Sequence, residues 1–356
     1  MGGERTKMTS DAIDHMRAAT KLAAHHLGLL ALLRRARRRE RSLILRYHAV
    51  VPDGAAAPAY AGPDITIPRG LFAAQMRFLQ RAYTPVPLAV MVEAIARHER
   101  PPGGAIAITL DDGYADNYHQ ALPVLRALGL PATVYVVTET VDGGAPLWMA
   151  ELRTAVMASR VPTLSVEIGG GRHFAIGEAG ERQRAIKELT NMLVPVDAPL
   201  RRRILGTIRS DLGVNNGNAG LKDAMLTSAQ IREMHGAGIT IGAHTETHSN
   251  MTLVPAEQAR AEIAGSRERL EQIVGAPVRD FAYPNTGGRY PHYNAAVAKI
   301  VRGLGFRSGV TSRPGVVAAA SNLHLLPRIG VSPRLHHEAP LAAALERYRL
   351  LGATQT

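Results

Sequence analysis

The sequence has no cysteine, a single tryptophan and few aromatic residues of any kind, 4% of the chain. Without thiols there can be no disulfide and no thiolate metal site, so any metal ion must use histidine, carboxylate or backbone oxygen ligands. Long apolar runs are also missing, because LGLLALL at residues 27–33 is far too short to span a bilayer. The hydrophobic fraction of 46% over 356 residues still supports a sizeable core and excludes a disordered chain.

Positive charge dominates, with a formal net charge of +12, and much of it lies in RRARRRER at residues 34–41. One interpretation is the solvated end of a basic helix, and the other is a phosphate-rich partner such as an anionic membrane surface. No aromatic side chains alternate with these arginines, so no nucleic-acid partner is expected. We therefore expect residues 1–41 to form a basic N-terminal helical extension that either packs on its own domain or binds a membrane surface.

The order of charged and apolar residues bears on location. A secretory signal places its positive charges first and a small-residue cleavage site afterwards. Here a polar segment precedes residues 27–33 and the arginines follow them. The sequence therefore predicts a cytoplasmic protein, peripheral to the inner face of the membrane if the basic helix binds there.

From residue 42 onward, short apolar runs alternate with segments of helical spacing. This alternation predicts parallel strands joined by helices. About seven such units favour a distorted (β/α) barrel over residues 42–340, with a doubly wound parallel sheet as the alternative. The predicted strands cover residues 42–47, 105–110, 132–137, 239–243, 278–282, 306–310 and 325–331.

Residues 145–225 interrupt the alternation. A hairpin pattern of alternating apolar residues surrounds Gly169-Gly170-Gly171, and two helical segments follow around 180–194 and 198–212. We expect this region to be an insertion between two barrel strands that forms a cap beside the site. Residues 341–356 are expected to form a C-terminal helix or tail.

Polar residues follow several of the predicted strands directly. Asp111 and Asp112 follow one strand, His48 and His244 each follow another, and Tyr283-Pro284 follow a fourth. In (β/α) barrels the catalytic groups lie at the carboxyl ends of the strands, so these side chains are expected to meet at one face.

His244 and His248, in GAHTETH, are four residues apart, so both imidazoles can reach one ion. With one carboxylate they would make a His₂–Asp site with open positions, which suits hydrolytic metal chemistry. One of the two adjacent aspartates would then be a ligand, and the other would act as a general base. The spacing HxxxH alone is weak support, and the acidic pair at another strand end strengthens it.

These motifs resemble those of the polysaccharide deacetylase superfamily, also called the NodB-homology or carbohydrate esterase family 4 superfamily. TLDDG at 109–113 is similar to its TFDDG motif, and HTETH at 244–248 is similar to its H-(S/T)-x-x-H motif. The resemblance covers most of residues 42–332. It implies that Asp111 is the general base and that Asp112, His244 and His248 bind a divalent metal ion, with zinc the first expectation.

The sequence departs from the family pattern in two places. Ala282, in FAYPNTG, occupies the position of an expected arginine, so Arg328 in LPRI becomes the candidate that orients Asp111, with Arg279 the weaker alternative. No good match to the family's late histidine motif lies near the C-terminus. Instead LILRYH at 43–48 resembles that strand moved to the front, as in the circularly permuted subgroup, which makes His48 the candidate general acid.

Five further residues are candidates for substrate binding. By analogy with the family, the backbone N–H of Tyr114 would help to bind an oxyanion. Trp148 either stacks on a sugar ring or packs in the core. Tyr283, Pro284 and Asn285 follow a strand, and Asn285 stands where the family often has an aromatic residue.

The function that the resemblance implies is metal-dependent hydrolysis of the N-acetyl group of an amino sugar or glycan intermediate, with release of acetate. Because no export signal is found, a lipid-linked or nucleotide-linked sugar fits better than an extracellular glycan. One alternative is a metal-dependent hydrolase of another C–N bond, of the deformylase or purine-ring amidohydrolase type. The other is an inactive sugar-binding scaffold.

Overall fold

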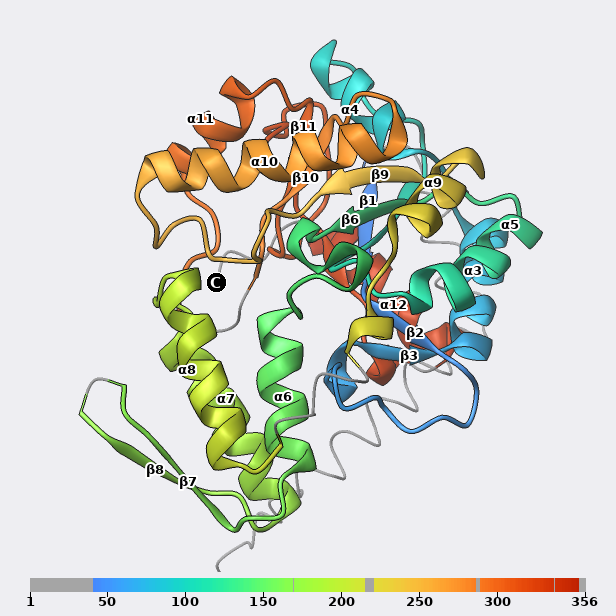
Figure 1. Cartoon of the computed structure of the whole chain (residues 1–356). Helices are drawn as coiled ribbons and strands as arrows, with labels where there is room; N and C mark the ends of the chain where they lie inside the picture. Colours follow the sequence, from blue (N-terminus) through green and yellow to red (C-terminus); the bar gives the residue numbers. More distant parts are fainter. Residues whose placement is uncertain (1–40, 169, 215–220, 286–288, 336, 352–356) are drawn as a thin grey trace, which may run out of the picture.

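The computed structural model describes residues 41–168, 170–214, 221–285, 289–335 and 337–351 (Figure 1). Its main sheet is parallel and curled, with the strand order β11-β10-β9-β6-β5-β1-β12, and the short β4 pairs with β5. This arrangement confirms the predicted distorted (β/α) barrel of about seven strands. The strands of the sheet are β1 (Leu43–Tyr47), β4 (Thr84–Pro85), β5 (Ala105–Leu110), β6 (Thr133–Val136), β9 (Thr240–Ala243), β10 (Asp280–Ala282), β11 (Ser308–Val310) and β12 (Ile329–Gly330).

The two edges of this curled sheet are linked by the segment that leads into β12. Leu326 forms a parallel bridge with Val310 of β11, and three residues later β12 begins and pairs with β1. A short pair of parallel strands, β2 (Ala49–Val51) and β3 (Thr66–Pro68), follows β1 outside the barrel sheet. The carboxyl end of β1 is therefore flanked by a small sheet of its own.

Helices cover the outer side of the barrel (Figure 1). Most of these helices pack their apolar faces against the outward-facing side chains of the strands, and together these residues form one large hydrophobic cluster. The helices of this cluster are α3 (Arg69–Ala82), α5 (Leu122–Ala127), α9 (Ser228–Gly236), α10 (Ala256–Val274), α11 (Ala295–Gly303) and α12 (Glu338–Leu351), whereas α4 (Leu88–Ala96) packs with the inner cluster. Short helical turns cover Pro63–Ile65, Asn117–Ala121, Thr138–Gly143, Lys222–Ala224 and Pro333–Leu335.

The two-residue period of the strands decides which side chains face the barrel interior. In β5, Ala105 and Ala107 belong to the inner cluster, whereas Ile106, Ile108 and Leu110 pack in the outer one. Continued past the end of β5, the same two-residue period places Asp111 on the inward side. In β1 the inward residues are Ile44 and Arg46, and the next in step is His48, so the strand period aims polar groups at the mouth of the barrel.

Residues between β6 and β9 form a second apolar cluster beside the barrel (Figure 1). This cluster is made by α6 (Trp148–Ala158), the antiparallel hairpin β7 (Thr163–Val166) and β8 (Arg172–Ala175), α7 (Ala179–Leu193) and α8 (Ala198–Asp211). We call these elements the cap. The hairpin and the two later helices lie where the sequence pattern places them, and α6 was missed because its apolar residues do not follow one clean stripe.

Two of the sequence-based predictions concern residues outside the described ranges: the N-terminal helix over 1–41, of which only Arg41 is described, and the last residues of the tail, 352–356. Within the described ranges, no helix is both long and apolar enough to cross a membrane.

Candidate metal and catalytic site

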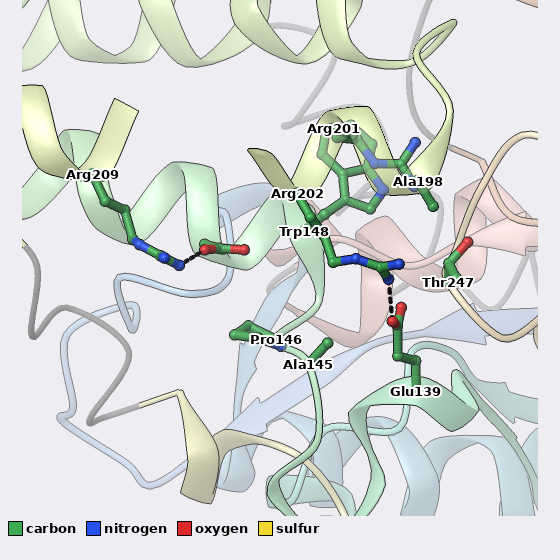
Figure 2. A pocket seen from close by; sticks show the side chains of 10 residues that line it. Glu139, Ala145, Pro146, Trp148, Ala198, Arg201, Arg202, Arg209 and Thr247 are labelled. Carbon is green, nitrogen blue, oxygen red and sulfur yellow. Dashed lines mark hydrogen bonds and ion pairs between the residues drawn. The ribbon is translucent and has the colours of Figure 1, made fainter. Parts of the chain in front are cut away.

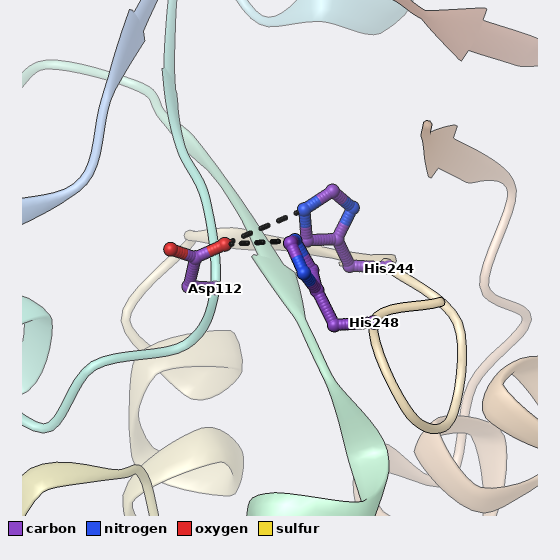
Figure 3. Close-up of side chains that lie close together, drawn as sticks. All are labelled: Asp112, His244 and His248. Atoms are coloured by element: carbon purple, nitrogen blue, oxygen red, sulfur yellow. Dashed lines mark ion pairs between the residues drawn. The ribbon is translucent and has the colours of Figure 1, made fainter. Parts of the chain in front are cut away.

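Asp112, His244 and His248 form a buried cluster at the carboxyl ends of β5 and β9 (Figure 3). The Nε2 atoms of His244 and His248 lie 3.5 and 3.4 Å from the same carboxylate oxygen of Asp112. The possible ligand atoms all lie within 4.8 Å of one another. Two imidazole nitrogens and one carboxylate oxygen directed at a common point form a donor set that suits a divalent transition metal.

The hydrogen bonds around the two histidines test whether this donor set fits a metal ion. His244 Nδ1 lies 2.8 Å from the carbonyl oxygen of Ala282, so this nitrogen carries the proton and leaves the Nε2 lone pair facing Asp112. His248 Nδ1 is buried without a hydrogen-bond partner among the described residues. The orientation of both Nε2 atoms, fixed for His244 by a backbone acceptor, fits a three-ligand metal site with open positions.

The backbone at these ligands is strained. Asp112 and His248 have φ of 77° and 54°, and Thr245 between the histidines has φ of 65°. Such values are uncommon outside glycine and cluster at functional sites. The loop is held by Thr245, whose hydroxyl accepts from the His248 N–H at 3.0 Å, and by Glu262 of α10, which accepts from two further loop N–H groups.

Charge favours the ligand forms of these residues. Burial alone would raise the pKa of Asp112, but the hydrogen bonds of His244 and His248, together with the charge of His248, hold it well below the usual value. Burial lowers the pKa of His248 despite the neighbouring carboxylate. At neutral pH an ionised Asp112 carboxylate therefore faces the neutral imidazole of His248, and these are the protonation states that bind a metal cation.

Asp111, the other aspartate of the pair, has a different partner. Arg328, which directly precedes β12, donates from Nη1 to Oδ1 of Asp111 at 2.6 Å and from Nη2 to Oδ2 at 2.7 Å. The guanidinium also donates to Thr109 Oγ1 at 3.0 Å and to the carbonyl oxygen of Thr311 at 2.9 Å, and Arg328 is completely buried. A guanidinium fixed at this many points gives the carboxylate one orientation.

The same pair determines the charge of Asp111. Burial alone would raise its pKa, but the Arg328 charge leads the opposing effects, with help from His244, and lowers the pKa to about 2. Asp111 is therefore ionised at neutral pH while it lies 3% exposed at the mouth of the barrel.

A cavity of about 290 Å³ joins these groups. His48, Asp111, Asp112, Tyr114, His244, His248 and Asn285 line it from the barrel side, and residues of α6 and α7 line it from the cap. Burial lowers the pKa of His48 to about 4, although Asp112 opposes this shift, so the imidazole is neutral at neutral pH. Most of the side chains proposed from the sequence are thus neighbours in one cavity.

The main-chain N–H of Tyr114, a residue that lines this cavity, is not used by the bridge beside it. Tyr114 and Met225 form an isolated antiparallel bridge, whose two hydrogen bonds are made by Ala115 and Leu226 rather than by Tyr114. Within the described part of the chain, no acceptor is found for the Tyr114 N–H. Burial, followed by the charge of Asp112, raises the pKa of the Tyr114 hydroxyl, so it stays neutral.

Three of the proposed substrate contacts lie elsewhere. Tyr283 is fully buried and donates to the carbonyl oxygen of His324 at 2.7 Å, and Pro284 is buried next to it, so neither lines the cavity. Trp148 is 4% exposed, its indole N–H lies 3.3 Å from the carbonyl oxygen of His248, and the Arg201 guanidinium covers its ring at 4.7 Å (Figure 2). Of the two interpretations of Trp148, the geometry supports packing, here against the metal-ligand loop.

Sequence reasoning missed two charged groups that line the cavity, Arg46 and Arg153. Asp116 lies outside the cavity lining, where it accepts from the Val50 N–H at 3.0 Å, and burial raises its pKa to about 7. Arg46 could have been identified from the sequence, because it lies two residues before His48 and so faces the same side of the strand. Arg153 belongs to the cap, and no pattern in the neighbouring sequence marks it.

The comparisons with known proteins agree with this geometry. Residues 98–161 and 207–309 match the family model of polysaccharide deacetylase. The chain therefore contains a polysaccharide deacetylase domain. The unmatched interval, 162–206, holds β7, β8, α7 and most of α8, all of which belong to the cap.

Individual relatives are distant but cover most of the chain. "Putative polysaccharide deacetylase YxkH" of Bacillus subtilis is 22% identical over 300 residues, which are 83% of this chain and 73% of that protein. The fold is similar to that of the Streptococcus pyogenes deacetylase PplD in complex with acetate, with a TM-score of 0.55, 20% identity, and coverage of 86% of this chain and 98% of the other. For IcaB from Ammonifex degensii the values are 0.53, 19%, 85% and 97%.

Replacing Arg328 by glutamine should destabilise the fold in a pH-dependent way. Asp111 would stay buried without its counter-charge, so we expect a loss of about 3–5 kcal/mol in the free energy of unfolding at pH 7.5. Because burial then dominates, the pKa of Asp111 rises above its unfolded value, and the loss shrinks as the carboxyl becomes protonated at lower pH.

Urea unfolding of wild type and Arg328→Gln at pH 7.5 and pH 4.5 measures this difference. Arg328→Lys keeps the charge without the two-point contact and should lose less at pH 7.5. An equal loss for Arg328→Gln at both pH values would show that Arg328 does not set the ionisation of Asp111.

Proposed function

We propose that this protein hydrolyses the N-acetyl group of an amino sugar in a glycan or glycan intermediate and releases acetate. The observation that carries the proposal is the contrast between the adjacent aspartates. Asp112 faces two histidine Nε2 atoms, whereas Asp111 is held ionised by Arg328 in the same cavity. The family match supports a glycan as the substrate class.

In this mechanism Asp112, His244 and His248 hold a divalent cation, for which zinc is the first candidate because the donor set is two imidazoles and one carboxylate. Such an ion, when bound, polarises both a water molecule and the acyl oxygen. Asp111 takes the proton from the attacking water, and Arg328 keeps its carboxylate aimed at that water. The Tyr114 N–H donates to the oxyanion that forms at the acyl carbon.

His48 is assigned the proton transfer to the departing nitrogen. Its imidazole is neutral at neutral pH, because burial lowers its pKa to about 4. It must therefore gain a proton within the catalytic cycle, and Asp111, which has just taken one from water, lines the same cavity. In this scheme, one proton moves from the water through Asp111 and His48 to the amine.

Ala282 has a different task from the arginine expected at its position. Its backbone carbonyl accepts from His244 Nδ1 at 2.8 Å and orients that ligand. We assign the orienting guanidinium to Arg328 instead, which directly precedes β12 and contacts Asp111 at the end of β5. In the sheet, β12 lies beyond β1 on one side of β5, whereas β10, which carries Ala282, lies on the other side. The base and the ligand thus receive their supports from different strands.

Acetate release by the zinc-loaded protein tests the function. We expect acetate from N-acetylated glucosamine and its oligomers, loss of this activity on chelation, and recovery when zinc is returned, because the donor set needs its ion. N-formylated sugars of the same sizes serve as the comparison. Formate release without acetate would favour another C–N hydrolase, and metal binding without release of either acid from any sugar would contradict the proposal.

Substituting His48 by glutamine distinguishes the role of the general acid from that of the general base. An amide needs its leaving nitrogen protonated, so kcat for the N-acetyl sugar should fall by about 10²–10⁴-fold. Hydrolysis of p-nitrophenyl acetate, whose leaving group needs no proton, should fall far less. Asp111→Asn is the matched variant and should impair both substrates. If His48→Gln lowers the two rates equally, His48 is not the acid.

A further inference from the structure

The cavity contains more positive charge than the proposed reaction uses. Arg46 of β1 and Arg153 of α6 both line it, and they come from the barrel and the cap respectively. The two catalytic carboxylates already have partners: Arg328 pairs with Asp111, and two histidines face Asp112. Arg46, Arg153, Arg328 and a divalent cation would therefore lie close to the two carboxylates that line the cavity.

Both surplus guanidinium groups are incompletely paired. Arg46 donates from Nη1 to the hydroxyl of Ser312, and Arg153 donates from Nη1 to Gln183 Oε1 at 3.1 Å. In each of them the Nε atom is buried and has no hydrogen-bond partner in the described part of the chain. A buried guanidinium N–H without an acceptor is costly, so such a donor indicates a missing oxygen acceptor.

Two arginines of α8 are neutralised by carboxylates of this chain. Arg202 pairs with Glu139 and Arg209 with Glu151 in the pocket beside Trp148 (Figure 2). In the described ranges, no comparable ion pair is found for Arg46 or Arg153. Burial, with the charge of Arg328 next, lowers the pKa of Arg46 to about 10, and burial lowers that of Arg153, so at neutral pH Arg46 keeps its charge.

We propose that Arg46 and Arg153 bind an anionic group, a phosphate or a carboxylate, on the amino-sugar substrate. This inference rests on the proposed deacetylation and names the class of its substrate. Guanidinium groups bind both kinds of oxyanion through paired N–H···O contacts. The cavity of about 290 Å³ is at the small end of ligand pockets, so the anionic group has to lie close to the acylated sugar ring.

Binding of deacetylated sugars tests the inference without turnover. The zinc-loaded protein is titrated calorimetrically with glucosamine, glucosamine 1-phosphate and 2-amino-2-deoxyglucuronic acid. We expect at least one anionic sugar to bind roughly ten- to hundredfold more tightly than glucosamine, as for hydrogen bonds to a charged group. The phosphate and carboxylate arms distinguish the two sources of negative charge.

The metal ion itself attracts anions, so variants are needed to distinguish its contribution to anion binding from that of the two arginines. Arg46→Gln and Arg153→Gln should each remove most of the preference for the anionic sugar, and Arg153→Lys should retain part of it. Arg160→Gln, at an exposed arginine just after α6, is the matched control and should keep the full preference.

Equal binding of charged and neutral sugars would overturn the inference. So would a preference that survives both glutamine variants, because the anion would then be bound by the metal ion alone. Failure of the proposed function gives a different result: tight, arginine-dependent binding of the anionic sugar, with no acetate released from its N-acetylated form.

Discussion

The two-point contact between Arg328 and Asp111 is the interaction on which the rest of the site depends. It places an ionised carboxylate in a nearly closed interior, where an isolated charge would be neutralised by protonation. It also occupies Asp111, which leaves Asp112 as the carboxylate that faces the histidines. Two adjacent like charges are tolerated because each has its own opposite partner, Arg328 for one and the proposed cation for the other.

The barrel and the cap contribute different parts of the cavity. The barrel supplies the proposed catalytic and metal-binding groups from the ends of β1, β5 and β9, and the cap supplies one wall through α6 and α7. The cap is also tied to the ligand loop, since the Trp148 N–H donates to the carbonyl of His248 and Arg201 donates to Ser249 Oγ at 2.8 Å. The interval 162–206, unmatched by the family model, falls in the cap. We infer that substrate selection is the task of the cap and that the chemistry belongs to the barrel.

The sequence predicted the barrel well because strand ends and strand period are local properties. The positions of Asp111, Asp112 and His244 follow from the apolar runs that precede them. The contact of Arg328 with Asp111 was predicted because Ala282 stands where the family has an arginine, so that another arginine had to orient Asp111. The role of Arg328 in orienting the base stays a prediction. Tyr283 and Pro284 show the limit of this reasoning, because both are buried outside the cavity. For Trp148 the sequence left packing and sugar stacking open, and its contact with the His248 carbonyl supports packing. Arg153 could not be found, since nothing near it in the sequence reports which wall of the cavity α6 forms.

The central claim is that the adjacent aspartates have unequal tasks, and metal stoichiometry tests it most directly. Zinc bound per chain is measured after dialysis for wild type, Asp111→Asn and Asp112→Asn, with folding checked by circular dichroism. The account predicts one zinc ion per chain in wild type and in Asp111→Asn, and a loss of zinc in Asp112→Asn. Equal zinc retention by the two folded variants, or a loss confined to Asp111→Asn, would contradict it.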